Sequence, residues 1–169
     1  MDTQNTEEII KTVKHIAPVF GGINLEDISA PRCFEIEERL VKELDIPVMH
    51  DDQRGTATVV LAALINALKV KGISKEEIKI VVNGAGAAGI AVSKMLLKYG
   101  FKNLILCDSK GPIYEGRADL NESKKEMAKK TNFGNIFGDL GAVLSGADMF
   151  VGVSKAGVLS GEMIKKMNE

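Results

Sequence analysis

A glycine-rich turn that follows a buried strand constrains the fold of this chain most. The segment "IKIVVNGAGAAGIAVSKMLLKYG" opens with a continuous apolar run, which is typical of a strand buried on both faces. Gly84, Gly86 and Gly89 then match the pattern G-x-G-x-x-G, and the periodicity after them indicates a helix. A second apolar run, "KNLILCD", ends in Asp108. This order predicts a strand–helix–strand unit in a parallel sheet.

Each glycine of the turn has a physical role in binding a dinucleotide. The first permits a tight turn, the second lets a pyrophosphate approach the backbone, and the third allows the helix to pack closely on the strand. The free N–H groups and the dipole at the helix N-terminus favour phosphates at the same place. Three glycines could also serve a tight turn alone. Because the strand, the helix, the second strand and the acid are all in place, we expect nucleotide binding.

Asp108 lies at the tip of the second strand, where its carboxylate could accept hydrogen bonds from the adenosine ribose. Such an acid favours NAD over NADP. Lys110 follows two residues later and could meet the 2′-phosphate of NADP instead. The sequence therefore favours NAD and leaves NADP possible.

A third apolar strand, "DMFVGVS", follows two more helical segments, "NESKKEMAKKTN" and "DLGAVLSGA", and a last helix is expected in "SGEMIKKM". The first of these helices is highly charged, so we expect it to be a solvated surface element. The fold class is therefore α/β, with a Rossmann-like, doubly wound parallel sheet. Three buried strands are about half of such a sheet, so we expect it to be incomplete.

The first part of the chain alternates helices with short strands. Helices are expected in "TEEIIKTVKHIA" and "RCFEIEERLVKEL", and short extended segments in "PVFGGINLEDI" and "IPVM". A further helix is expected from about Gly55 to Val70. Because this helix is apolar nearly all round, we expect other elements to enclose it.

Two pairs of adjacent acids, Glu26–Asp27 and Asp51–Asp52, end the two short extended segments. If those strands are neighbours, the four carboxylates form one cluster, and like charges held so close call for a cation. Oxygen ligands favour Mg²⁺ or Mn²⁺. An interpretation of equal weight makes Asp52 a helix cap and the first pair solvated loop residues. His50 is interpreted as a structural hydrogen-bonding residue.

Composition excludes several other classes of function. The chain has 169 residues, 45% hydrophobic and 27% charged, with a net charge of -1. This balance is typical of a soluble globular protein and gives no reason to expect a nucleic acid or a membrane as partner. The most apolar stretch, "ATVVLAALINAL", is shorter than the ~20 residues of a membrane span. Cys33 and Cys107 show no metal or redox spacing, and reduced thiols favour the cytoplasm.

Four segments in order resemble successive motifs of bacterial-type malic enzymes: "FGGINLEDISAPRCFEIE", "IPVMHDDQRGTATV", "VVNGAGAAGIA" and "CDSKGPIYEGR". The resemblance covers nearly the whole chain. It implies a metal-dependent oxidative decarboxylation of L-malate to pyruvate and CO₂, with reduction of NAD or NADP. It also implies a homodimer for the complete enzyme.

The resemblance assigns roles to the matching residues. The Glu–Asp of the "LED" motif and the second Asp of "HDD" are metal ligands in the family, here Glu26, Asp27 and Asp52. Asp51, the first Asp of "HDD", is expected to support a catalytic lysine electrostatically. The glycine-rich turn carries the dinucleotide, and its residues here are Gly84, Ala85, Gly86, Ala87, Ala88 and Gly89.

The resemblance also implies a domain division and some departures from a complete enzyme. Residues 1–52 are expected to be the C-terminal part of the malate- and metal-binding domain, and residues 53–169 the N-terminal part of the NAD-binding Rossmann domain. The family's catalytic tyrosine and lysine lie upstream of "LED" and have no match here, so we expect a central piece of the enzyme whose autonomous activity is doubtful. Arg54 stands where the family usually carries glutamine or histidine, and it could pair with Asp52.

Two other functions compete with this one. The chain could be an NAD-binding module without turnover, or part of another hydroxy- or amino-acid dehydrogenase in which the acids are only helix caps. The ordered "LED" and "HDDQ" motifs make the last of these the weakest.

Overall fold

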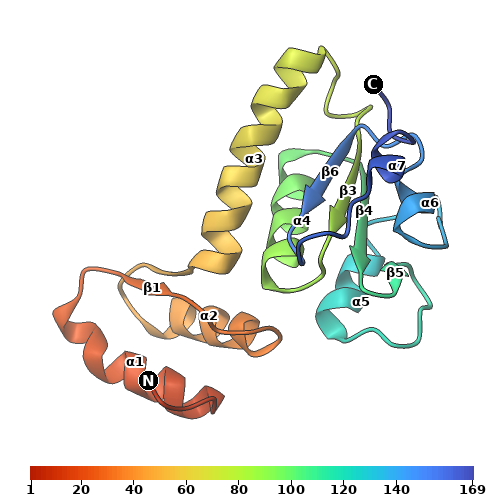
Figure 1. Ribbon diagram of the computed structural model, residues 1–169. Helices are drawn as coiled ribbons and strands as arrows, with labels where there is room; N and C mark the ends of the chain where they lie inside the picture. The colour runs from red at the N-terminus through yellow and green to blue at the C-terminus, as the bar shows by residue number, and fades with distance from the viewer.

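The computed structural model describes all 169 residues, as a small N-terminal unit joined by one long helix to a larger α/β unit (Figure 1). The elements in chain order are α1 (Thr6–Ile16), the 3-10 helix η1 (Ala17–Val19), β1 (Ile23–Leu25), α2 (Arg32–Glu43), β2 (Val48–His50), α3 (Asp51–Lys71), β3 (Lys79–Asn83), α4 (Ala87–Tyr99), β4 (Asn103–Asp108), β5 (Gly111–Pro112), α5 (Glu122–Ala128), α6 (Leu140–Leu144), β6 (Met149–Gly152) and α7 (Gly161–Ile164).

The N-terminal unit consists of two short parallel strands, β1 and β2, covered by α1 and α2. Helix α1 begins where the side chain of Asn5 accepts hydrogen bonds from the backbone N–H groups of Glu7 and Glu8, which satisfies two otherwise unpaired donors. The apolar residues of both helices and of β1 meet in one core: Ile9, Ile10, Val13, Leu25, Ile36 and Leu40. The expected helices and strands are confirmed, except that the stretch around Pro18 forms a 3-10 turn instead of an extended segment.

Helix α3 begins at Asp51, directly after β2, four residues earlier than the expected start at Gly55. The expectation that other elements enclose this helix is wrong. Ala57 and Leu64 are buried and the helix packs mainly on α4, whereas Val59 is 65% exposed and Val70 is 88% exposed. In Figure 1 the helix lies along one side of the larger unit, and α4 separates it from the sheet. Within this chain α4 covers one face of α3 and leaves the opposite face to solvent.

The larger unit contains a four-stranded sheet in the order β5-β4-β3-β6. Strands β4, β3 and β6 are parallel, and β5 is a two-residue antiparallel strand at the edge that the sequence did not reveal. The three apolar strands expected from the sequence are confirmed. Because β3 is flanked by β4 on one side and β6 on the other, the strand order reverses at β3, as in a doubly wound fold.

Helices cover both faces of this sheet. Ile80, Val82 and Leu106 pack in one core that also takes in residues of α3, α4 and α5. Val81 and Ile105 point to the opposite face, where residues of α6 and α7 pack on them. The expected α/β class with a Rossmann-like parallel sheet is confirmed.

Two smaller expectations concern side chains. The charged helix α5 is not wholly solvated, because Met127 and Ala128 in its last turn are buried. Both cysteines are free and buried, and burial raises the pKa of the Cys107 thiol to about 12. None of the helices combines the length and the apolar character needed to cross a membrane.

Candidate functional site

The glycine-rich turn lies between the end of β3 and the start of α4, and two of its glycines are required by close backbone contacts. Gly84 has φ of 123°, and its N–H donates to the carbonyl of Cys107 at 2.9 Å. A Cβ atom on Gly84 would lie 2.6 Å from the carbonyl oxygen of Val153, and one on Gly89 would lie 1.5 Å from the carbonyl oxygen of Gly84. No larger residue fits at either position without moving the backbone.

Gly86 differs from both of these glycines. It has φ of -92°, which any residue can adopt, and a Cβ atom there would meet no heavy atom within 4 Å. It is the N-cap of α4, and no side chain caps that helix. The free N–H groups of the first turn therefore face open space, where an anion could approach the backbone closely.

A cavity of about 730 Å³ lies at the carboxyl ends of the strands beside this turn. It is lined by Asn83, Asp108, Ser109, Lys110, Gly111, Gly138, Asp139, Leu140, Ser154, Lys155 and Val158. Open α/β sheets bind their ligands in this position, outside the carboxyl ends of the strands where the strand order reverses. The ends of β3 and β4 thus border one ligand-sized space, and the turn follows directly after its lining residue Asn83.

Asp108 lies at the tip of β4 as expected, but its carboxylate is already heavily hydrogen-bonded. Arg117 Nη2 donates to Oδ1 at 2.8 Å and to Oδ2 at 3.0 Å, and Lys124 Nζ donates to Oδ2 at 2.6 Å. The backbone N–H of Lys110 donates to Oδ1 at 3.0 Å. Burial raises the pKa of Asp108, but the bonds from Lys124, Lys110 and Arg117 outweigh it, so the pKa lies below its ordinary value.

These contacts limit what Asp108 can offer to a ribose. A carboxylate has about four acceptor positions, and four hydrogen bonds already use them. Lys110, the expected alternative partner of a 2′-phosphate, has its ammonium group paired with Asp119 at 2.8 Å. The sequence interpretation missed Arg117 and Lys124, which lie nine and sixteen residues after Asp108.

The two acid pairs end neighbouring strands, as the sequence interpretation required. Leu25 lies opposite His50 in the parallel pair β1–β2, so Glu26 and Asp51 follow at the same end of this sheet. The side chains do not gather into one cluster, because no three acidic, histidine or cysteine side chains lie close enough together to hold a metal ion.

The helix-cap interpretation is only partly right. Glu26 and Asp27 are exposed loop residues ahead of α2, as that interpretation expected. Asp52 is not the cap of α3, because the helix begins at Asp51, its N-cap is His50, and no side chain makes a capping hydrogen bond. Both aspartates lie in the first turn, where the helix dipole favours negative charge.

His50 departs from its interpretation as a hydrogen-bonding residue. Its side chain is fully buried, and neither ring nitrogen has a hydrogen-bond partner. The Nδ1 atom lies 4.0 Å from Oδ2 of Asp52. The acids that follow the two neighbouring strands offer carboxylate oxygens, and the imidazole beside them is buried without a hydrogen-bond partner. Oxygen donors of this kind suit a hard divalent cation. Glu26, Asp27 and Asp52 stay predicted ligands of that ion.

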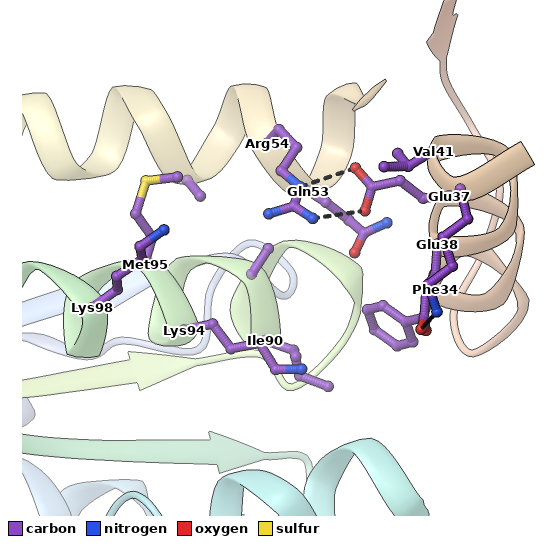
Figure 2. Close-up of a pocket in the computed structure, with 13 residues that line it drawn as sticks. Phe34, Glu37, Glu38, Val41, Gln53, Arg54, Ile90, Lys94, Met95 and Lys98 are labelled. Atoms are coloured by element: carbon purple, nitrogen blue, oxygen red, sulfur yellow. Dashed lines mark hydrogen bonds and ion pairs between the residues drawn. The ribbon is translucent and has the colours of Figure 1, made fainter. Parts of the chain in front are cut away.

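Glu37 is a buried residue of this region that the sequence interpretation missed. Its Oε1 accepts from the backbone N–H of His50 at 3.1 Å and from Nε of Arg54 at 2.9 Å. Figure 2 shows this ion pair between α2 and the first turns of α3, beside a cavity of about 420 Å³ that also reaches α4. Arg54 therefore pairs with Glu37 and not with Asp52, the partner that the sequence left possible.

Comparisons with known proteins agree with this geometry. A protein-family model described as "Malic enzyme, NAD binding domain" matches residues 53–169, and one described as "Malic enzyme, N-terminal domain" matches residues 2–41. The NAD-dependent malic enzyme of Geobacillus stearothermophilus is 57% identical over 167 residues, which are 99% of this chain and 35% of that protein. The bifunctional malic/malolactic enzyme of Bacillus subtilis is 55% identical over 168 residues, which are 99% of this chain and 41% of that protein.

A solved structure gives the same result for the fold. The NAD-dependent malic enzyme of Thermotoga maritima superposes with a TM-score of 0.96 at 50% identity, over 100% of this chain and 45% of that chain. The chain thus spans less than half the length of these relatives. Over nearly its whole length its sequence and fold match part of theirs, and it belongs to the malic enzyme family.

Proposed function

We propose that this chain carries the dinucleotide-binding turn and the acidic ligands of a malic enzyme that oxidises L-malate and releases pyruvate and CO₂, with reduction of NAD. The geometry of the glycine-rich turn is the main support for this proposal. Gly84 and Gly89 close the turn tightly, and Gly86 leaves open the path by which a pyrophosphate reaches the N-terminus of α4. The residues from Gly84 to Gly89, Ala85, Ala87 and Ala88 included, would bind it through their backbone.

The acid pairs have distinct roles in this proposal. Glu26, Asp27 and Asp52 would hold Mg²⁺ or Mn²⁺, and their place after two neighbouring strands supports this assignment. When bound, such an ion polarises the hydroxyl and carboxylate oxygens of malate. Asp51 would orient a catalytic cation. Its position in the first turn of α3, next to Asp52, presents it at the same end of the small sheet.

The preference for NAD over NADP is part of the proposal. Asp108 lies at the rim of the cavity at the tip of β4, where an acid of this motif favours the ribose hydroxyls of NAD over a 2′-phosphate. Lys110 would have to leave Asp119 to bind that phosphate. We further propose a homodimer for the complete enzyme and a cytoplasmic place of action, where the two thiols stay reduced.

One observation favours a second candidate, an NAD-binding module without turnover. The acidic side chains are not gathered into a metal cluster in the structure. The two candidates differ in their response to Mn²⁺, which only the enzyme requires.

The test is the variant Asp52→Ala, with Asp45→Ala as matched control. Asp45 is an exposed acid of the same unit, in the loop before β2. We expect Asp52→Ala to abolish Mn²⁺ binding, as measured by electron paramagnetic resonance. Its affinity for NADH should stay within a factor of two of the wild-type value. We expect Asp45→Ala to change neither. Equal loss of both ligands in Asp52→Ala would indicate a folding defect, and unchanged Mn²⁺ binding would contradict the metal assignment.

A further inference from the structure

Glu37 is a carboxylate that the fold buries at a cost. Helix α2 carries glutamates at 35, 37, 38 and 43, and Glu37 is the buried one, with 6% of its side chain exposed. A buried charge is unfavourable unless partners satisfy it. Glu37 has three such contacts: the backbone N–H of His50 at 3.1 Å, Arg54 Nε at 2.9 Å and Arg54 Nη2 at 3.3 Å.

The two partners of Glu37 flank the second acid pair. His50 immediately precedes Asp51, and Arg54 follows Asp52 by two residues on α3. One side chain from another helix therefore binds the chain on both sides of the two aspartates. Figure 2 shows Glu37 reaching from α2 toward the start of α3, with Arg54 facing it.

Without this contact Arg54 would have other acids to bind. Its side chain is 61% exposed and long, and it lies one helical turn from Asp51. In the structure it pairs with Glu37 instead, and it lies within ion-pairing distance of neither Asp51 nor Asp52. An arginine bound to Asp52 would compete with a cation for the same oxygens.

We propose that Glu37 is a positioning residue: it holds the junction between β2 and α3 and keeps the guanidinium of Arg54 away from Asp51 and Asp52, so that Asp52 stays available to a divalent cation. The inference rests on the proposed function for the metal, and it adds residues that have no direct contact with that metal. It also explains how this chain accommodates an arginine at position 54.

The experiment measures the affinity of the whole chain for Mn²⁺ alone, from the signal of free Mn²⁺ in electron paramagnetic resonance. Glu37→Gln keeps the shape of the side chain and can still accept from the His50 N–H, but it loses the charge that holds Arg54. We expect about ten-fold weaker Mn²⁺ binding, the size of effect seen when a group that orients a metal ligand is removed. Glu38→Gln is the matched control, because Glu38 is the next residue of α2, is exposed and pairs only with Lys42. It should bind Mn²⁺ within a factor of two of the wild type.

A second substitution separates positioning from a general structural role. Arg54→Gln should change Mn²⁺ affinity less than two-fold in the wild type, where Glu37 already holds the arginine. In the Glu37→Gln background it should restore most of the lost affinity, because the competing guanidinium is gone. A variant that is merely misfolded gains nothing from a second substitution.

The outcomes distinguish this inference from the function on which it rests. Weaker binding in Glu37→Gln together with recovery in the double variant supports the inference. If the wild type binds Mn²⁺ and Glu37→Gln binds it equally well, the inference alone is overturned. The same holds if Glu37→Gln binds Mn²⁺ more weakly and the double variant does not recover the lost affinity. A wild-type chain that binds no Mn²⁺ overturns both the metal assignment and the inference.

Discussion

Asp108 shows how one residue can be placed correctly by its motif and still behave differently from what the motif implies. It lies at the tip of β4, beside the glycine turn, as the sequence predicts. Its carboxylate, however, is held by Arg117 and Lys124. Its role in the structure is therefore to hold the loop after β4 as well as to border the cavity.

Asp108→Asn should destabilise the chain at pH 7 by about 1–3 kcal/mol, because the buried Arg117 keeps only Asp119 of its two carboxylate partners and Lys124 loses its ion pair. The pKa of Asp108 is lowered in the folded state from an ordinary 3.8, so its ionised form stabilises the fold. That contribution is complete above the unfolded pKa and is lost as the pH falls through the folded pKa. Urea unfolding at pH 7 and at acid pH measures it, and the gap between wild type and variant should narrow below pH 3.8.

The control for this prediction is Asp45→Asn, an exposed acid with no ion pair in the structure, which should change the free energy of unfolding by less than about 0.5 kcal/mol. If Asp108→Asn were as stable as the wild type at pH 7, the ion pairs around Asp108 would contribute nothing and this account of the residue would be wrong.

At the scale of elements, the long helix α3 is the part whose environment the sequence predicted least well. Its residues are apolar on nearly all sides, and such a pattern is typical of an enclosed helix. The structure packs it mainly along α4, with Ala57 and Leu64 buried and Val59 exposed. The apolar pattern records which faces can be buried, but only the arrangement of the other elements determines which faces are covered.

Two alanine substitutions on α3 test this description. Leu64 is 2% exposed, so Leu64→Ala should lower the free energy of unfolding by about 3 kcal/mol. Val59 is 65% exposed, so Val59→Ala should lower it by less than about 0.5 kcal/mol. Both values come from urea titrations of the purified chain. Equal losses for the two variants would show that the second face of α3 is covered in solution.

The sequence predicted local features better than contacts between distant residues. Residues within one short window determine each of the strands β3, β4 and β6 and the turn at Gly84. Local sequence patterns are therefore enough to predict these elements. The start of α3 was misplaced because the acids Asp51 and Asp52 resemble a loop, whereas a strand leads directly into the helix.

Buried charges are the features that the sequence could not reveal. Glu37 is spaced from Cys33 and Leu40 so that it lies on the buried face of α2, but a glutamate is a residue type that is mostly exposed, and only the tertiary contact with Arg54 explains its burial. Arg117 likewise reaches back to Asp108 across a loop that has no regular pattern. Such pairs depend on the tertiary structure, which a single sequence does not display.

At the scale of the whole molecule, the chain presents two carboxyl-end surfaces: that of the small sheet, with the acid pairs, and that of the large sheet, with the glycine turn. Helix α3 joins the two units, because it begins at the acids and packs along α4, the helix that follows the turn. The proposed enzyme needs both surfaces, whereas an NAD-binding module needs only the second.

A titration with NADH, monitored by nicotinamide fluorescence, compares the wild-type chain with Gly86→Ala and shows whether the glycine-rich turn binds the dinucleotide. We expect saturable binding by the wild type. We expect at least ten-fold weaker binding by Gly86→Ala with an unchanged urea midpoint, because the added methyl group meets only the open space that the pyrophosphate needs. A folded wild-type chain that binds no NADH, or a Gly86→Ala variant that binds it equally well, would contradict the claim that this turn carries the dinucleotide.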